Sequence, residues 1–318
     1  MKVEYKPICD CCNHYKTNLH THSTYSDATI PLTEMVKEHY NQDFDILGIA
    51  DHGVIGKEWD EQPTLIPLYQ YNPLIGNKQA HFTTEEYESI VAGTYSDGTT
   101  RTKTTGMNCV TGAIEGNMLV IQKNHVNGYF MNNDSTEGYL GDEGDFGTVI
   151  KMIEDAGGVS HINHPGDWLH SAGDADIARD PKNVAIFADI IKKYDSCLGI
   201  EAFNAFDRPT RNDRILWDEL LQVLIPEGER TVWGFSNSDA HQTDQLDTAF
   251  MDFILPEYSE KNLRFAMENG CFFSQARYAK NELGEDFKGI GDLPKVNGLC
   301  VDDEADTITL KGANCKAI

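Results

Sequence analysis

The sequence predicts an α/β fold built on a parallel sheet or a closed barrel, and three observations lead to that expectation. Strand-like apolar runs alternate with helix-like stretches about seven times, which is the pattern of parallel α/β architectures. Nearly every candidate ligand follows the end of a strand-like run, and in such barrels that face carries the chemistry. With 318 residues, 40% of them hydrophobic, the chain can bury the core of one large domain or two small ones.

The first part of the chain predicts strands on either side of a helix. Residues 16–22 are expected to form the first strand, and Pro31 stands where a helix would begin, because proline suits a first helical turn. The apolar residues after it recur at helical spacing: Leu32, Met35, Val36 and Tyr40. Residues 44–50 form a mostly apolar run typical of a buried parallel strand. Further strand-like pieces lie at 108–114 and 118–121, and the second leads toward residues 124–130.

The second part continues the alternation. Residues 146–156 predict an amphipathic helix that ends at Gly157-Gly158, since glycine is favoured just after a helix. The remaining core elements are expected to be helices at 184–194 and 215–224 and strands at 159–165, 197–203 and 231–235. After residue 252 the pattern weakens to a helix at 262–267 and a strand-like piece at 307–310.

Two domains and one insertion are expected. Residues 1–255 would form the barrel, and residues 256–318 would add a helix and a small β-rich appendage packed on it. Residues 54–105 contain Pro63, Pro67 and Pro73, several tyrosines and a polar, glycine-bearing run, and they are too many for a simple connection. We expect this segment to be a cap-like insertion that covers part of the functional site.

The acidic composition limits the class of partners. The formal net charge is −25, so long nucleic acids would be repelled. Small phosphorylated substrates stay compatible with it, because bound cations invert the charge locally. No apolar run approaches the roughly 18 residues of a membrane span, and the first residues lack the apolar core of a signal peptide. These features predict a cytoplasmic protein that does not enter a membrane.

The cysteines predict no disulfide framework. Five are scattered singly and are expected to be reduced thiols: Cys109, Cys197, Cys271, Cys300 and Cys315. Cys9, Cys11 and Cys12, with His14, could hold zinc by composition. No second Cys-x-x-Cys completes such a site, so a reduced cluster is favoured over a structural zinc ion.

The candidate metal ligands begin with a His-x-His pair. His20 and His22 point to the same side if the chain is extended there, and Asp27 follows in a turn. The full set of candidate ligands is His20, His22, Asp27, His52, Glu115, His125, His164, Asp239 and His241. One catalytic zinc ion takes three protein ligands, so nine predict two or three divalent ions bridged by carboxylates. Mixed imidazole and carboxylate ligation suits zinc, manganese or iron, and clustered ions can hold a hydroxide nucleophile and clamp a phosphoryl group.

These motifs resemble those of the PHP family, named for polymerase and histidinol phosphatase. The resemblance rests on motifs in the family's order: His20-Thr21-His22 with Asp27, Ala50-Asp51-His52, Gly112-Ala113-Ile114-Glu115, His125, His164-Pro165 and Ser238-Asp239-Ala240-His241. It implies a distorted seven-stranded (β/α) TIM-like barrel, a trinuclear metal site and phosphoester hydrolysis. The segment between His52 and Glu115 is longer than expected for the family, which leaves the substrate class open.

The resemblance also implies how the ligands are grouped. One ion would be held by His20, His22, Glu115 and Asp239, a second by Glu115, His125 and His164, and a third by Asp27, His52 and His241. Glu115 and Asp239 would then bridge ions and be the catalytic carboxylates.

Residues beside these motifs suggest supporting roles. Residues 204–214 follow a strand end and hold three arginines, and we expect Arg208 or Arg211, but not both, to bind the substrate phosphate. His161 and His170 flank His164, and for both a structural role is favoured over a catalytic one. His39 and His81 are expected to be solvated. Asp51 would orient a ligand or accept a backbone hydrogen bond.

The leading hypothesis is a metal-dependent phosphoesterase that acts on a small phosphomonoester or nucleotide. An exonuclease is disfavoured by the acidic charge. An amidohydrolase-like barrel normally has a metal-bridging lysine, and none stands at an obvious strand end after Glu115. A non-catalytic metal-stabilised module is disfavoured by the complete set of ligands. The sequence leaves the metal, the general acid and the oligomeric state open.

Overall fold

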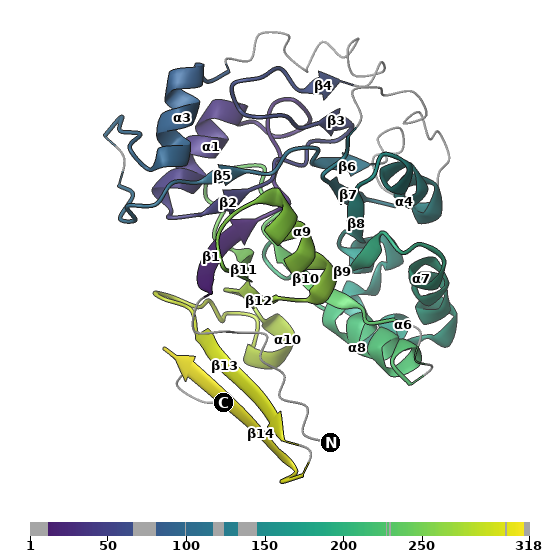
Figure 1. The fold of residues 1–318 in the computed structure, drawn as a ribbon. Coiled ribbons are helices and arrows are strands. Elements are labelled where there is room, and N and C mark those ends of the chain that lie inside the picture. Colours follow the sequence, from purple (N-terminus) through teal and green to yellow (C-terminus); the bar gives the residue numbers. More distant parts are fainter. Residues whose placement is uncertain are drawn as a thin grey trace.

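A computed structural model describes residues 12–65, 81–98, 100–116, 124–132, 145–226, 228, 230–302 and 304–314. Most of the described strands belong to two five-stranded sheets that face each other, with helices on their outer sides (Figure 1). The expected α/β class is therefore confirmed.

The first sheet combines the start of the chain with a later return. Its strands are β1 (Asn13–Asn18), β2 (Ile46–Leu47), β5 (Asn108–Cys109), β11 (Ala249–Leu255) and β12 (Phe272–Ala276). Their order is β12-β11-β1-β2-β5; β1, β2 and β5 run parallel, while β11 is antiparallel to both β1 and β12. The sequence-based reading did not identify β11 and β12. The first strand also ends at Asn18, earlier than expected, so His20 and His22 lie beyond it.

The second sheet comes from the middle of the chain. Its strands are β6 (Ile114–Gly116), β7 (Val126–Tyr129), β8 (Val159–Ile162), β9 (Cys197–Asn204) and β10 (Trp233–Asn237). They pair in sequence order, with β7 antiparallel to both neighbours and β8, β9 and β10 parallel. The strand expected at 108–114 is instead divided between β5 and β6, which belong to different sheets. The strand expected at 118–121 lies outside the described residues.

The two sheets meet along two seams, each marked by a single backbone bridge. Thr21 pairs with Ala240 beyond the ends of β1 and β10, and His52 pairs with Glu115 beyond β2. A closed seven-stranded barrel is therefore not confirmed: the described strands form two sheets that touch at isolated bridges. The strands at one seam, β2, β5 and β6, are only two or three residues long, which leaves too little backbone for a continuous ladder.

The helices confirm the expected amphipathic stretches. The longer ones are α1 (Leu32–Asn41), α3 (Thr84–Ala92), α4 (Phe146–Asp155), α7 (Pro181–Lys193), α8 (Asp213–Leu224) and α9 (Glu260–Asn269). The shorter ones are α5 (Pro165–Leu169), the 3-10 turn η1 (Ser171–Gly173), α6 (Ala175–Arg179) and α10 (Lys280–Leu283). The Asp145 side chain caps α4 by accepting a hydrogen bond from the backbone of Thr148. Gly270 ends α9 with a φ of +66°, a conformation that favours glycine.

Apolar residues pack on both faces of the sheets. Between the sheets, Tyr129, Phe235 and Phe253 are fully buried, and Leu263 and Met267 of α9 join the same cluster. Helices α4, α7 and α8 cover the outer face of the second sheet, and α1 covers the first (Figure 1). This packing holds the strand ends, and the loops after them, on a rigid base.

Residues 54–105 pack partly into the core. They contribute β3 (Val54–Ile55), β4 (Thr64–Leu65) and α3, and buried Trp59, Phe82 and Ile90 join the apolar cluster around α1. Residues 66–80 and 99 lie outside the described part, so the cap-like role of this insertion stays a prediction.

The end of the chain forms a hairpin of β13 (Lys295–Asp302) and β14 (Thr307–Ala313). It extends away from the two sheets (Figure 1), and most of its side chains are exposed, including Ile308. The strand-like piece expected at 307–310 falls within β14. Among the described residues, every helix is too short or too polar to cross a membrane.

Candidate metal centre

All nine candidate ligands converge at one edge of the two sheets. His20, His22 and Asp27 follow β1, His52 follows β2, Glu115 lies in β6, His164 follows β8, and Asp239 and His241 follow β10. His125 precedes β7 instead of following it. Because β7 is antiparallel to its neighbours, its amino end lies at the edge where the parallel strands have their carboxyl ends.

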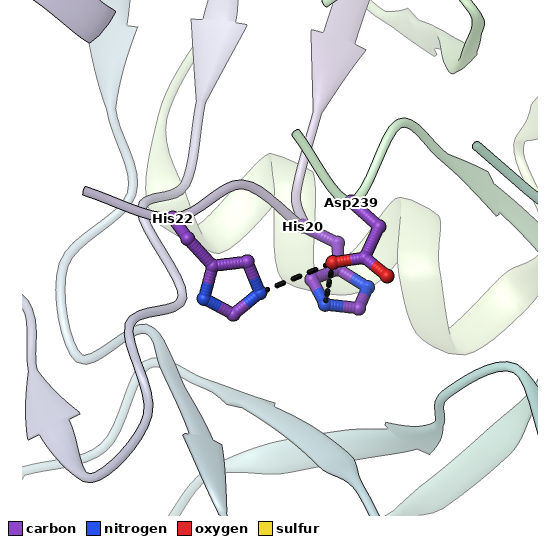
Figure 2. A group of neighbouring side chains, drawn as sticks. All are labelled: His20, His22 and Asp239. Carbon is purple, nitrogen blue, oxygen red and sulfur yellow. Dashed lines mark ion pairs between the residues drawn. The ribbon is translucent and has the colours of Figure 1, made fainter. Parts of the chain in front are cut away.

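His20, His22 and Asp239 form one group of ligand atoms. The Nε2 atoms of both histidines lie 3.2 Å from Asp239 Oδ1. Figure 2 shows these two ion pairs as dashed lines that meet at the Asp239 carboxylate. The backbone fixes this arrangement, because the Asp239 N–H donates to the carbonyl of His20 at 2.9 Å and the His22 N–H donates to that of Ala240. The two histidines point the same way, as their spacing predicted. Asp239 adopts a left-handed φ of +49°, a strained conformation of the kind found at functional sites.

Glu115 lies at the middle of the cluster and is fully buried. Its oxygens are 2.9 Å from His125 Nδ1, 3.0 Å from His52 Nδ1 and 3.2 Å from His22 Nε2. His20 and His164 approach them at 3.6 and 3.8 Å. Five imidazoles therefore surround this buried carboxylate.

Asp27 lies at the solvent-facing edge of the cluster, with its side chain 53% exposed. Its oxygens lie 3.3 Å from His241 Nε2, 3.6 Å from His52 Nε2 and 3.8 Å from His22 Nδ1. This side of the cluster is therefore the accessible one, while Glu115 forms its buried base.

The residues fit a group of divalent ions. Several buried ligand atoms make no hydrogen bond of regular geometry with the described residues, although some lie within 3.2 Å of a carboxylate oxygen: His20 Nε2, His22 Nε2, Glu115 Oε2 and both ring nitrogens of His125. Buried polar atoms are normally satisfied, so an unpaired set of this kind indicates a missing partner. Four overlapping triads have ligand atoms within 4.8 Å of one another: His20-His22-Asp239, His20-Glu115-His164, His22-Asp27-His52 and His52-Glu115-His125. Imidazole with carboxylate is a ligand set for zinc, manganese or iron.

The cluster holds its carboxylates ionised. Burial alone would raise the pKa of Glu115, but the neighbouring His52, His125 and His20 outweigh it and hold that pKa well below its usual range. For Asp239, burial is likewise outweighed, chiefly by His20 and His22. Burial opposes protonation of His164, yet Glu115 and Asp239 raise its pKa to about 9. Metal binding would have to displace that proton, since only neutral imidazole is a ligand.

Further buried residues support the ligands, and the sequence-based reading did not assign them. Glu201 accepts a hydrogen bond from His20 Nδ1 at 2.8 Å, and Asn163 donates to Glu115 Oε1 at 2.7 Å. Asn204 donates to Asp239 Oδ2 at 3.3 Å. The available signal was a carboxylate inside the apolar run of β9, where a buried acid needs a partner.

Asp51 supports a ligand indirectly. It accepts hydrogen bonds from the backbone N–H of Ser23 at 2.7 Å and from the Ser26 hydroxyl. Ser26 Oγ in turn lies 3.3 Å from His22 Nδ1. Both roles considered for Asp51 are therefore present: it accepts a backbone bond and steadies His22 through a hydroxyl.

The remaining histidines differ from some expectations. His39 was expected to be solvated and is instead fully buried, donating from Nδ1 to the Met35 carbonyl and accepting from Asn18 at Nε2. His81 is only partly buried and contacts Tyr25 and Gln62. His161 is buried and hydrogen-bonded to the hydroxyl of Tyr129, and His170 is exposed. A structural role for His161 agrees with the interpretation favoured from the sequence.

The two candidate phosphate-binding arginines lie in different surroundings. Arg211 forms an ion pair with Glu285, and its neighbour Arg214 pairs with Asp207 and Glu282. These pairs fasten the segment around α10 to the loop after β9. Arg208 is exposed and has no ion pair among the described residues. Of the two candidates, only Arg208 is uncommitted to an acidic partner.

A small cavity of about 50 Å³ adjoins the cluster at His125 and His164. Phe146 and Trp168 form its apolar wall, and their rings pack edge to face with centroids 5.5 Å apart. An apolar wall therefore lies directly beside two candidate ligands.

Comparison with known proteins supports the fold. The sequence matches no protein-family profile and no curated protein sequence. The structure is similar to the crystal structure of a two-domain protein from Bacteroides vulgatus that contains a predicted PHP-like metal-dependent phosphoesterase. The TM-score is 0.52 at 17% sequence identity, and the match covers 85% of this chain and 67% of the other. The chain thus shares its fold with a PHP-like protein, as the motifs suggested.

Proposed function

We propose that this protein is a metal-dependent phosphoesterase that hydrolyses a small phosphorylated substrate, either a phosphomonoester or a nucleotide. The observation that carries the proposal is the convergence of nine candidate ligands, four of which have buried atoms without a hydrogen-bond partner among the described residues: His20, His22, Glu115 and His125. The fold shared with a PHP-like protein supports the same reaction class.

The ligand geometry supports two to three divalent ions, zinc, manganese or iron. In the proposed trinuclear arrangement, Glu115 contacts ligands of every group, and Asp239 joins His20 with His22 and lies 3.8 Å from His164. These two carboxylates are the proposed bridges. Asp27 and His241 would complete the group at the exposed edge.

The chemistry divides between the ions and the chain. Bound divalent ions supply an activated water as nucleophile and neutralise the charge of the phosphoryl oxygens. The chain keeps Glu115 and Asp239 ionised and orients the imidazoles through buried acceptors. Asp27 is on the accessible side, so the phosphoryl group would enter there. Arg208 is the proposed phosphate-binding cation because its charge is not neutralised by a described neighbour.

The rest of the substrate would lie toward the cavity lined by Phe146 and Trp168. Aromatic side chains favour planar or apolar groups, which is compatible with an aryl or nucleoside leaving group. The net charge of −25 argues for a small substrate that is attracted locally by the ions. We propose no membrane partner, and long nucleic acid is disfavoured as a substrate.

A substrate panel with parallel elemental analysis tests the proposal. Protein purified without chelator and reconstituted with manganese, iron or zinc should contain more than one ion per chain. It should hydrolyse some members of a panel of alkyl, aryl and nucleoside phosphates, and chelation should abolish that activity. A fully loaded protein that hydrolyses none of these esters would exclude the proposed reaction. Cleavage of oligonucleotides alone would favour a nuclease.

A further inference from the structure

Glu201 occupies an unusual position in strand β9. Its side chain is fully buried, and hydrogen bonds fill both carboxylate oxygens. Oε1 accepts from His20 Nδ1 at 2.8 Å and from Asn237 Nδ2 at 3.0 Å. Oε2 accepts from Asn204 Nδ2 at 2.9 Å and from the backbone N–H of His164 at 3.1 Å.

The partners of Glu201 are not those of a simple buried ion pair. No lysine or arginine pairs with it in the described part of the chain; its ion-pair partner is the imidazole of His20. A buried carboxylate is costly unless it is fully hydrogen-bonded, so this one is kept by four donors. Two of the donors belong to candidate ligands, His20 and His164. The other two are Asn237, two residues before Asp239, and Asn204, which also donates to Asp239. The carboxylate therefore contacts the parts of the chain that carry the candidate ligands.

Glu201 determines which ring nitrogen of His20 faces the cluster. Since Nδ1–H donates to Glu201, the other nitrogen, Nε2, is directed at Asp239 and Glu115. The same carboxylate holds the backbone of His164, whose φ of +24° is otherwise strained. Through Asn204 it also reaches Asp239.

We infer that Glu201 is a positioning residue of the metal centre: it orients His20, His164 and, through Asn204, Asp239 for metal binding. This inference rests on the proposed function only in that the centre binds metal ions. Acceptors behind metal-bound histidines fix the tautomer and raise ligand basicity, and their loss typically weakens metal binding by about 10–100-fold.

The test is the metal affinity of Glu201→Gln, measured by competition with a chelating dye for manganese and for zinc. Glutamine keeps the shape of the side chain but replaces one acceptor oxygen with a donor amide, which cannot accept from all four donors. We expect at least one dissociation constant to rise by about 10–100-fold, while far-ultraviolet circular dichroism of the metal-free protein stays unchanged.

A matched control distinguishes the loss of a contact that positions metal ligands from the general effect of removing a buried carboxylate. Asp252 is a buried carboxylate that also pairs with a histidine, His14 Nδ1, at 2.7 Å, but in β11 away from the ligands. Asp252→Asn should leave the metal dissociation constants within about twofold of the native values. A folded Glu201→Gln with native metal affinity would overturn the inference, as would an equal loss in Asp252→Asn.

The native protein offers a second measurement that needs no variant. In the zinc-loaded form, long-range proton–nitrogen spectra should show a histidine that is protonated at Nδ1 and metal-bound at Nε2, and His20→Gln should remove its signals. Absence of that tautomer for His20 would overturn the inference even if Glu201→Gln failed to fold. Weakened metal binding without any phosphoester turnover would instead refute the proposed function and leave Glu201 as a positioning residue.

Discussion

The candidate metal centre and a cavity between the first sheet and the hairpin differ in how their polar groups are satisfied. The cavity, of about 420 Å³, lies at the amino end of β1, between the first sheet and the start of the hairpin. Three of the cationic groups that line it pair with acids: Lys16 and Arg277 with Asp247, and Lys103 with Asp45. At the carboxyl end of β1, several buried ligand atoms have no hydrogen-bond partner among the described residues.

The candidate centre is distinguished by a concentration of such atoms on its ligands, since single residues of this kind, such as Asp213, also occur elsewhere in the described part of the chain. Two buried histidines near β1 also differ in whether both of their ring nitrogens have hydrogen-bond partners. His39 has both ring nitrogens paired, to Met35 and Asn18, and serves the core. His20 has Nδ1 paired to Glu201 and Nε2 without a described hydrogen-bond partner, and it faces the cluster.

The strongest test of the comparison is Glu115→Gln. Removing the central charge should release the ions that Glu115 bridges and lower kcat/KM by about three orders of magnitude or more, since metal ions contribute several kcal/mol to catalysis. Elemental analysis and turnover of the best ester measure both effects, with circular dichroism as the control for folding. Native metal content and turnover in this variant would remove Glu115 from the centre.

A smaller effect is expected at Arg208, because a single charge-assisted contact to phosphate contributes less than the ions do. Arg208→Ala should raise KM for the best ester about tenfold, while metal content stays unchanged. Arg211→Ala is the matched control, since its guanidinium is already held by Glu285, and it should change KM by less than about twofold. The opposite ranking of the two variants would assign the phosphate contact to Arg211.

His39 should affect stability through pH and leave the metal centre intact. Burial lowers its pKa to about 3, from an ordinary value of 6.5. Below pH 6.5 the unfolded chain therefore takes up a proton that the folded protein excludes, and stability falls as the pH drops toward 3. The contribution is at most about 1.4 kcal/mol per pH unit.

His39→Gln should remove this contribution, so the free energy of unfolding should depend less steeply on pH between about 6 and 4. Urea unfolding across that range measures the slope. The matched control is His170→Gln, an exposed position, which should retain the native slope. An unchanged slope in His39→Gln would show that the side chain is not held neutral in the folded protein.

The smallest effect on function is expected in the large cavity. Lys16→Met removes a paired ammonium there, and Asp247 keeps Arg277 as its partner. Metal content and kcat/KM should stay within about twofold of native values, although stability should fall slightly. A marked loss of turnover would make the cavity part of the functional site and break the comparison.

The sequence predicted the convergence of the nine candidate ligands better than the architecture around them. Strand ends meet at one edge of such sheets, so patterns along the chain were sufficient to find nine side chains that lie together. The helix at 146–156 was found to within one residue at its end, because spacing and the following glycines agree. Strand partners depend on tertiary packing, which is why antiparallel β11 and the two open seams were missed.

Two residues show where local reasoning failed. His39 lies seven positions after Leu32, on the same apolar face of α1, so its burial could have been predicted from the helical period. Glu201 gave a weaker signal, because an acid in an apolar strand is equally compatible with an exposed face. Only the fold brings it within hydrogen-bonding distance of His20, 181 positions earlier in the chain.

The position of the seams would couple metal binding to the contact between the two sheets. Thr21 and Ala240, which form one seam, are flanked by candidate ligands on both sides, and the other seam joins His52 directly to Glu115. Ions bound there would connect ligands of the first sheet to ligands of the second sheet at both seams. Removing the ions would leave the two sheets joined by the backbone bridges and by the apolar cluster between them. We therefore expect metal binding to add to the stability of the folded protein, because ions that bind only the folded state stabilise it.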